Sequence, residues 1–306
     1  MRRFLYNEKG YVEHADWAPH CWVNVECPDS GDIDFMLHDL GIPASFLESI
    51  SDADERPRIE HEGQWKLTIL RVPMRLEGGE TPYATIPFGI VTNGEVVLTL
   101  CYRETEMVSD FISHTRAKEI EIFAEPDFIL RLIYSSTFWF LKYLKDINAQ
   151  ELSATRQLQR SVRNKDLLEF MKLQQSLVFF NTSLRGNQML LSRIQRLYRD
   201  QYDRDLLEDV DIELKQANNT VNVYIEILTS AMDTFASIIS NNVNDIMRKM
   251  TAISIILMVP TLIASFYGMN VDIDIAHGRY AFWVILGGSF ALALLLYYFL
   301  RKIHWL

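Results

Sequence analysis

The sequence predicts an α/β domain, followed by a long helix and two membrane-spanning helices at the C-terminus. Residues 251–271 and residues 280–300 contain no Asp, Glu, Lys or Arg, and each segment is long enough to cross a hydrocarbon core as a helix. Residues 145–250 contain no proline and only one glycine, Gly186, which is typical of long helices. The alternative for the two apolar segments is a pair of buried core helices, but these seldom run so far without a charge.

Residues 1–145 show the mixed pattern of a cytoplasmic α/β domain. Strands are expected at residues 21–25, 58–62 and 65–72, because these runs are rich in apolar and β-branched residues. Asn93-Gly94 joins two further strands, at residues 86–92 and 95–102, and suits a type I′ hairpin turn. Helices are expected at residues 33–40 (ending at Gly41), 105–118 and 127–144.

The rest of the chain divides into helical segments. We expect a helical hairpin at residues 146–202 and a stalk helix at 203–250, with a break at Gly186 or near residues 202–205. The first span follows at 251–271, an external loop at 272–279, the second span at 280–300 and a basic cytoplasmic tail at 301–306.

The charges flanking the spans predict their orientation. Arg248 and Lys249 precede the first span, and Arg301 and Lys302 follow the second. The positive-inside rule therefore places both termini in the cytoplasm. No signal peptide is apparent at the N-terminus, so we expect the N-terminal domain to stay on the side of synthesis.

Composition adds little about chemistry. The net charge of −10 suits a soluble acidic domain as well as a protein that attracts cations, and we expect no nucleic-acid partner. Cys21, Cys27 and Cys101 form an odd set without metal-ligand spacing and are interpreted as reduced thiols. No phosphate loop, nucleophile elbow or dinucleotide fingerprint is present, so enzyme activity is not expected and no cofactor is implied.

A polar stripe along the first span is the strongest indication of function. Its members recur every three or four residues, so they share one face of a helix. Within and just before the span they are Asn244, Met247, Thr251, Ser254, Met258, Thr261 and Ser265. Small polar residues at ordinary helix–helix contacts are the alternative, but that alternative does not explain why the stripe continues before the span through Asp233.

A second stripe lies beside the first and is apolar: Ile225, Leu228, Met232, Phe235 and Ile239. Its 3-4 spacing predicts packing against a neighbouring helix. Two spans in one chain cannot enclose an ion path, so a pore requires a ring of identical subunits.

Tyr267-Gly268-Met269-Asn270 stands at the end of the first span. Gly-Met-Asn at this place, between two C-terminal spans, resembles the signature of the CorA family of magnesium and divalent-cation transporters. Residues 47–50 and 56–60, Pro260-Thr261-Leu262 and the closing Trp305-Leu306 are also similar to that family.

The resemblance implies a funnel-shaped homopentamer in the membrane, which takes up Mg²⁺, with Co²⁺ and Ni²⁺ as further candidates. It implies that Gly268, Met269 and Asn270 form the selectivity filter, and that the polar stripe lines the pore with Met247 and Met258 as apolar constrictions. A ring of amide carbonyls can bind Mg²⁺ through its water shell, so the ion need not lose the water that it sheds reluctantly.

The resemblance also implies regulation by internal Mg²⁺, bound by Glu48, Asp209 and Asp233. Two departures from the family are visible. Ser49 stands where the family often has a second acid, and Val271-Asp272-Ile273-Asp274 replaces a Met-Pro-Glu segment after the filter. Asp272 and Asp274 are candidates for attracting cations to the entrance.

Two other functions remain open from the sequence. One is transport of Zn²⁺ or another transition metal within the same superfamily, with or without proton coupling. The stripe carries no Cys or His, which favours a hard hydrated ion. The other is a membrane-anchored sensor without a pore, which would not need a polar stripe through its span.

Overall fold

The computed structural model describes residues 1–76, 78, 81–160, 164–199, 201–269 and 280–305. The chain forms two compact units, Met1–Met232 and Asp233–Leu306, and each is described by itself.

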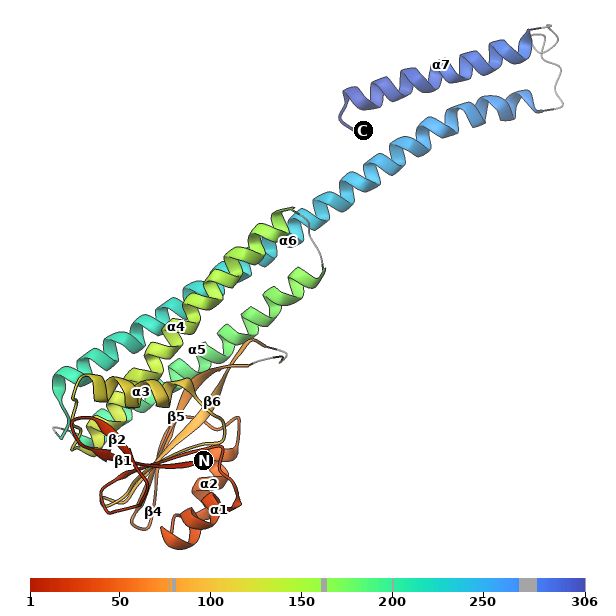
Figure 1. Cartoon of the computed structure of the whole chain (residues 1–306). Helices are drawn as coiled ribbons and strands as arrows, with labels where there is room; N and C mark the ends of the chain where they lie inside the picture. The colour runs from red at the N-terminus through yellow and green to blue at the C-terminus, as the bar shows by residue number, and fades with distance from the viewer. Residues whose placement is uncertain (77, 79–80, 161–163, 200, 270–279, 306) are drawn as a thin grey trace. The chain divides into compact units, whose positions relative to one another are not determined.

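The first unit is built on a mixed seven-stranded sheet (Figure 1). Its strands run in the order β2-β1-β3-β7-β6-β5-β4, and only the β3–β7 pair is parallel. Their bounds are β1 Arg2–Asn7, β2 Tyr11–His14, β3 Trp22–Glu26, β4 Arg58–Glu62, β5 Trp65–Arg75, β6 Tyr83–Thr92 and β7 Val97–Cys101. The interior strand β3 is buried along its whole length, as expected when helices cover both faces of a sheet.

Short helices cover one face of the sheet. They are α1 (Ser30–Asp34), the π-helix η1 (Phe35–Asp39) and α2 (Ala44–Ser51). Phe46 and Ile50 of α2 belong to the same buried cluster as Val23 and Leu67 of the strands. Gly89 of β6 allows this close packing, because a Cβ there would lie 2.2 Å from the Ile50 side chain.

The other face carries α3 (Glu106–Ala117) and two long helices, α4 (Glu125–Arg160) and α5 (Asn164–Tyr198). Figure 1 shows α4 and α5 as an antiparallel pair beside the sheet. Helix α5 is tied to β5 by Asn187, whose side chain accepts from the Arg71 amide (3.0 Å) and donates to the Arg71 carbonyl (2.8 Å).

The second unit holds the end of α6 (Arg204–Tyr267) and all of α7 (Ala281–Lys302). Helix α6 has 64 residues, which corresponds to about 95 Å at 1.5 Å per residue. It begins in the first unit and is continuous into the first apolar span, so the predicted stalk helix and first span form one element.

Several predicted boundaries need correction. Helix α4 begins at Glu125 and crosses the predicted domain boundary between residues 145 and 146. The two helices of the predicted hairpin are α4 and α5. Gly186 does not separate them, because it lies inside α5. A Cβ at Gly186 would lie 2.8 Å from the ring of Pro57. The predicted type I′ turn is wrong, because such a turn needs a positive φ at both central residues. Gly94 has a positive φ (92°), but Asn93 does not. Strands β1 and β2 were not predicted.

A half-buried polar network joins the sheet to both long helices. The Glu125 carboxylate accepts hydrogen bonds from Lys66 Nζ (2.8 and 3.0 Å), Tyr198 Oη (2.6 Å) and Thr92 Oγ1 (2.8 Å). Burial alone would raise the pKa of Glu125, but these hydrogen bonds and the Lys66 charge outweigh it and lower the pKa below its ordinary value of 4.5.

This network predicts a pH-dependent stability. Because the pKa of Glu125 is lower in the folded chain, its stabilising contribution is present above the unfolded pKa and disappears as the pH falls through the folded pKa. We expect Glu125→Gln to cost about 1–3 kcal/mol at pH 7 and to flatten the dependence of the melting temperature on pH below about 4.5. Thermal unfolding of the full chain in detergent measures both. The exposed Glu121→Gln is the matched control, and a parallel loss of stability on acidification in wild type and Glu125→Gln would assign the effect to other groups.

Candidate functional site

The polar stripe of the first span lies on helix α6. In the single chain all of its members are exposed: Asn244, Met247, Thr251, Ser254, Met258, Thr261 and Ser265. Their spacing of three and four residues places them on one face. Ala252 and Ile263, on the opposite face, are buried and half-buried respectively.

The hydroxyl groups on this face have a common geometry. Three of them donate to the carbonyl four residues earlier: Thr251 to Met247 (2.8 Å), Ser254 to Met250 (2.9 Å) and Thr261 to Leu257 (2.9 Å). The proton of each hydroxyl is therefore satisfied within the helix, while the oxygen keeps lone pairs that can accept. Such oxygens can accept hydrogen bonds from the water shell of a cation.

The two methionines of the stripe are exposed in the single chain, Met247 at 58% and Met258 at 64%. Pro260 lies between Met258 and Thr261 without ending the helix. A proline has no N–H for the carbonyl of Ile256, and membrane helices tolerate such a gap where nearby groups satisfy it.

The predicted filter lies at the end of α6. The helix ends at Tyr267, and the Gly268 amide donates to the carbonyls of Ala264 (3.0 Å) and Ser265 (3.2 Å). The φ of Gly268 is not in the left-handed region, so the backbone at this point does not by itself require glycine. Asn270, Asp272 and Asp274 lie outside the described residues.

The apolar surfaces of α6 and α7 are not covered by the chain. Of the most apolar 18-residue window, 6% is buried in α6 and 11% in α7. Core helices of a soluble protein would be mostly buried, so the core-helix alternative is wrong for this structure. Both helices have the length and composition to cross a membrane.

The apolar second stripe is partly used within the chain. Leu228 is 1% exposed, and it continues a buried row on the first part of α6: Val210, Leu214, Ala217 and Val221. Helix α6 contacts α5 here, since Gln188 donates to Asp211 (2.8 Å) and Asn218 donates to the Leu184 carbonyl (3.5 Å). At Leu228, the apolar stripe therefore packs against the same chain and is not available for contact with another copy.

The predicted regulatory acids are exposed and separate. Glu48, Asp209 and Asp233 are all exposed, and in the described part of the chain no three His, Cys, Asp or Glu side chains are grouped to hold a metal ion. Asp211 of the neighbouring acid cluster instead forms an ion pair with Lys215 (2.5 Å).

A basic side chain contacts Ser49, the neighbour of Glu48, which the sequence did not indicate. Arg58 donates to the Ser49 hydroxyl (3.1 Å) and pairs with Glu55 and Glu60. The Ser49 hydroxyl therefore accepts from a guanidinium that two carboxylates also contact. The Arg56-Pro57-Arg58 sequence was the only available signal.

Asp209 lines a cavity of 390 Å³ between α3, α4 and the start of α6. Asp110, His114 and Arg131 share this cavity. Burial raises the pKa of Tyr134 in the same wall, and the charges of Glu213 and Asp209 raise it further.

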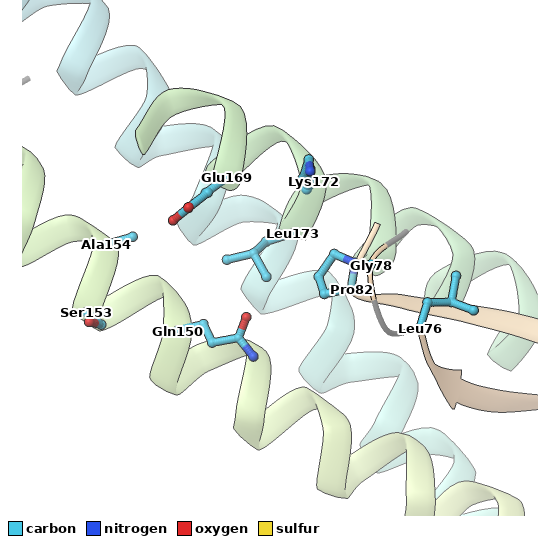
Figure 2. Close-up of a pocket in the computed structure, with 9 residues that line it drawn as sticks. All are labelled: Leu76, Gly78, Pro82, Gln150, Ser153, Ala154, Glu169, Lys172 and Leu173. Atoms are coloured by element: carbon cyan, nitrogen blue, oxygen red, sulfur yellow. The ribbon is translucent and has the colours of Figure 1, made fainter. Parts of the chain in front are cut away.

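A cavity of 350 Å³ lies between α4, α5 and the β5–β6 connection (Figure 2). Its charged side chains are Glu169 and Lys172, of opposite sign, and its Gln150 donates to the Tyr83 hydroxyl (3.0 Å). Its described lining contains none of the residues that the sequence analysis selected, and the two charges there cancel.

Comparison with known proteins agrees with the fold and the span arrangement. A cobalt/magnesium transport protein CorA of Methanocaldococcus jannaschii is 25% identical over 296 residues, covering 93% of this chain and 91% of that protein. The complete structure of the CorA magnesium transporter from the same organism superposes with a TM-score of 0.84 at 20% identity, covering 100% of this chain and 99% of that one. The full-length CmaX protein gives a TM-score of 0.70 at 17% identity, with coverages of 98% and 97%.

The family model described as CorA-like Mg²⁺ transporter protein matches residues 17–302. This match extends from the α/β unit through both candidate spans, and the chain belongs to the CorA-like Mg²⁺ transporter family.

Proposed function

We propose that this chain is one subunit of a homopentameric channel that admits Mg²⁺ across the cytoplasmic membrane. One observation carries the proposal: α6 is continuous from the α/β unit into an uncovered apolar span, and a stripe of exposed hydroxyl and amide groups follows one face of it. A ring of copies brings these stripes to a common axis, with the apolar faces toward lipid and neighbours. Membership of a transporter family supports transport and gives no role to enzyme chemistry.

The chemistry of the stripe favours a hydrated hard cation. The hydroxyl oxygens of Thr251, Ser254 and Thr261 accept hydrogen bonds from a water shell, so Mg²⁺ passes without the cost of full dehydration. Rings of Met247 and Met258 form apolar constrictions that stop ions by dewetting. At the outer end, Gly268, Met269 and Asn270 form the filter, where the Asn270 carbonyls bind the hydrated ion.

The ion selectivity of the channel is tested by measuring the uptake of Mg²⁺, Co²⁺, Ni²⁺ and Zn²⁺ into proteoliposomes. The relative from M. jannaschii is named a cobalt/magnesium transport protein, so we expect Co²⁺ to enter as well, with Ni²⁺ the next candidate. Uptake of Zn²⁺ in preference to Mg²⁺, or uptake driven by a pH gradient, would favour the transition-metal alternative. No Cys or His lies on the stripe to bind such an ion.

The pore proposal predicts different effects on the two faces of α6. Asn270→Ala should abolish selective Mg²⁺ uptake, and Thr261→Val should lower uptake because it removes a water-accepting oxygen without changing side-chain shape. Ile263→Val, on the opposite face, is the control and should transport like wild type. The measurement is Mg²⁺ influx into proteoliposomes, with size-exclusion chromatography to verify assembly. Wild-type uptake by correctly assembled Asn270→Ala would refute the filter.

We also propose that the α/β unit, the N-terminus and the C-terminal tail lie in the cytoplasm and the loop at residues 272–279 outside. Arg248, Lys249, Arg301 and Lys302 flank the spans on the inner side. Asp272 and Asp274 then stand at the outer entrance, where they attract cations.

The topology predicts where a thiol reagent reaches the chain. Cys27 is exposed, whereas Cys21 and Cys101 are buried and burial raises the pKa of both thiols, that of Cys101 to about 12. Cys27 should therefore react with an impermeant maleimide only after the cells are permeabilised. Asp274→Cys in a Cys27→Ser chain should react in intact cells. Labelling of Cys27 from outside intact cells would reverse the proposed orientation.

We further propose that internal Mg²⁺ regulates the channel. Asp209 and Asp233 are exposed acids on α6, and no metal-holding group of acids exists within the described part of one chain. A site built from them therefore needs an acid of a neighbouring copy, and a bound Mg²⁺ would offset the repulsion between subunits. Because Ser49, next to Glu48, is a hydroxyl that contacts Arg58 and not a second acid, the two α6 acids carry most of this effect. Mg²⁺ then favours the closed ring by binding it better than the open one.

This regulation is measured by protease protection. Mg²⁺ should protect the wild-type cytoplasmic part from digestion but should protect Asp209→Asn/Asp233→Asn much less. The control is Asp205→Asn/Glu208→Gln, which removes the same charge from the same helix and should respond like wild type. Equal protection of all three proteins would place the sensor elsewhere.

A further inference from the structure

The last turns of α7 carry an exposed face whose chemistry changes along the helix. Leu295 and Tyr298 are 71% and 72% exposed, and Arg301 and Lys302, at the end of the helix, are exposed as well. Steps of three and four residues place Leu295, Tyr298 and Lys302 on one face. Along this face the side chains therefore change from apolar to phenolic to cationic.

The spacing of this face matches the depth profile of one lipid leaflet. Four residues separate Tyr298 from Lys302, which corresponds to about 6 Å along the helix axis. The headgroup region of a bilayer adds about 5–7 Å on each side of the hydrocarbon core. A tyrosine ring at the edge of the hydrocarbon therefore places the Lys302 ammonium at the depth of the lipid phosphates.

The presence of lipid beside these cations is indicated by the apolar surface of α7 and not by the charges themselves. The most apolar part of the helix is almost entirely exposed in the single chain, and the helix is long enough to cross a membrane. In a membrane, the part of this surface that no other helix covers lies against acyl chains. Lipid headgroups then surround the end of the helix that carries Arg301 and Lys302.

The residues that follow α7 fold back onto the helix instead of leading away from it. The Trp305 amide donates to the Leu300 carbonyl (3.0 Å), and the His304 amide donates to the Arg301 carbonyl (3.2 Å). Because His304 is in the left-handed region (φ of 60°), these two bonds form a Schellman cap. The cap holds the exposed Trp305 beside the last turn, at the depth of the two cations. An indole ring is favoured at this boundary between hydrocarbon and water.

The two cations are not used for pairing within the chain. Residues 280–305 contain no Asp or Glu, and neither Arg301 nor Lys302 forms an ion pair in the part of the chain that the structure describes. The backbone cap already satisfies two carbonyls of the last turn, so these side chains are not needed to cap the helix. Before the first span, by contrast, Arg248 lies 3.8 Å from Asp245 of the same helix. The end of α7 therefore has two positive charges available for an anion.

We propose that this end of α7 binds the headgroup of an anionic phospholipid, with the phosphate on Arg301 and Lys302 and the glycerol region against Tyr298 and Trp305. A zwitterionic headgroup fits less well, because its own cation would meet two positive charges and no carboxylate of α7. In the proposed orientation this lipid belongs to the cytoplasmic leaflet. The inference needs α7 to lie in a membrane, but it does not need the ion path of the proposed function.

The test is quenching of Trp305 fluorescence by brominated lipid in phosphatidylcholine liposomes that contain the full chain. In a Trp283→Phe chain, Trp305 is the only tryptophan after residue 139. Brominated phosphatidylglycerol and brominated phosphatidylcholine are compared at equal mole fraction. We expect phosphatidylglycerol to be preferred about fivefold beside Trp305. Arg301→Gln/Lys302→Gln should abolish this preference, whereas Arg301→Lys should keep it because the charge remains.

The matched control is Arg185→Gln/Arg193→Gln, which removes the same charge from two exposed residues of α5 and should keep the preference. Unchanged quenching by brominated phosphatidylcholine verifies that the α7 double variant still lies in the bilayer.

Three results would overturn the proposal. The first is equal quenching of the Trp283→Phe chain by the two brominated lipids, which would show general lipid contact only. The second is a preference that survives Arg301→Gln/Lys302→Gln. The third is loss of the preference on addition of glycerol 3-phosphate, since a soluble phosphate compound would then be the ligand. Mg²⁺ uptake into the same liposomes tests the channel separately, so loss of uptake with a retained lipid preference would count against the channel alone.

Discussion

The uncovered apolar surface of α6 and α7 is the constraint on which the rest of the molecule depends. Nearly nine-tenths or more of the most apolar part of each helix is left exposed by the chain itself, so this surface must be covered by lipid or by other copies. A lone polar stripe facing lipid would be unfavourable in hydrocarbon. In a ring of copies, lipid would cover the apolar faces and the polar stripes would face one another, away from lipid. The proposed pore therefore depends on the proposed oligomer.

The continuity of α6 gives the α/β unit a mechanical connection to the span. Its first part is anchored by buried residues such as Val210, Leu214 and Val221 and by hydrogen bonds to α5. No loop residue interrupts α6 between Val221 and Met247. The proposed regulatory acids Asp209 and Asp233 and the polar stripe therefore belong to one helix.

The α/β unit also contains polar groups that the transport proposal does not use. The Glu125 network is a structural element: its carboxylate is saturated by Lys66, Tyr198 and Thr92 and holds together the sheet, the start of α4 and the end of α5.

The sequence by itself determined the two spans, the long helix before them and the face that carries the stripe, because charge-free length and a repeat of three and four residues are local properties. The resemblance around Gly268, Met269 and Asn270 led to the family that the comparisons show. The tertiary structure decided what depends on contacts between distant residues. Strand β1 begins with Arg2 and Arg3 and β2 ends with Glu13 and His14, and β1 takes its place in the sheet by pairing with β3. Arg58 reaches Ser49 only after β4 is placed beside α2, and Leu228 is buried only because the first unit covers part of the apolar stripe. No periodicity reports such long-range contacts, since they are formed between elements and not within them.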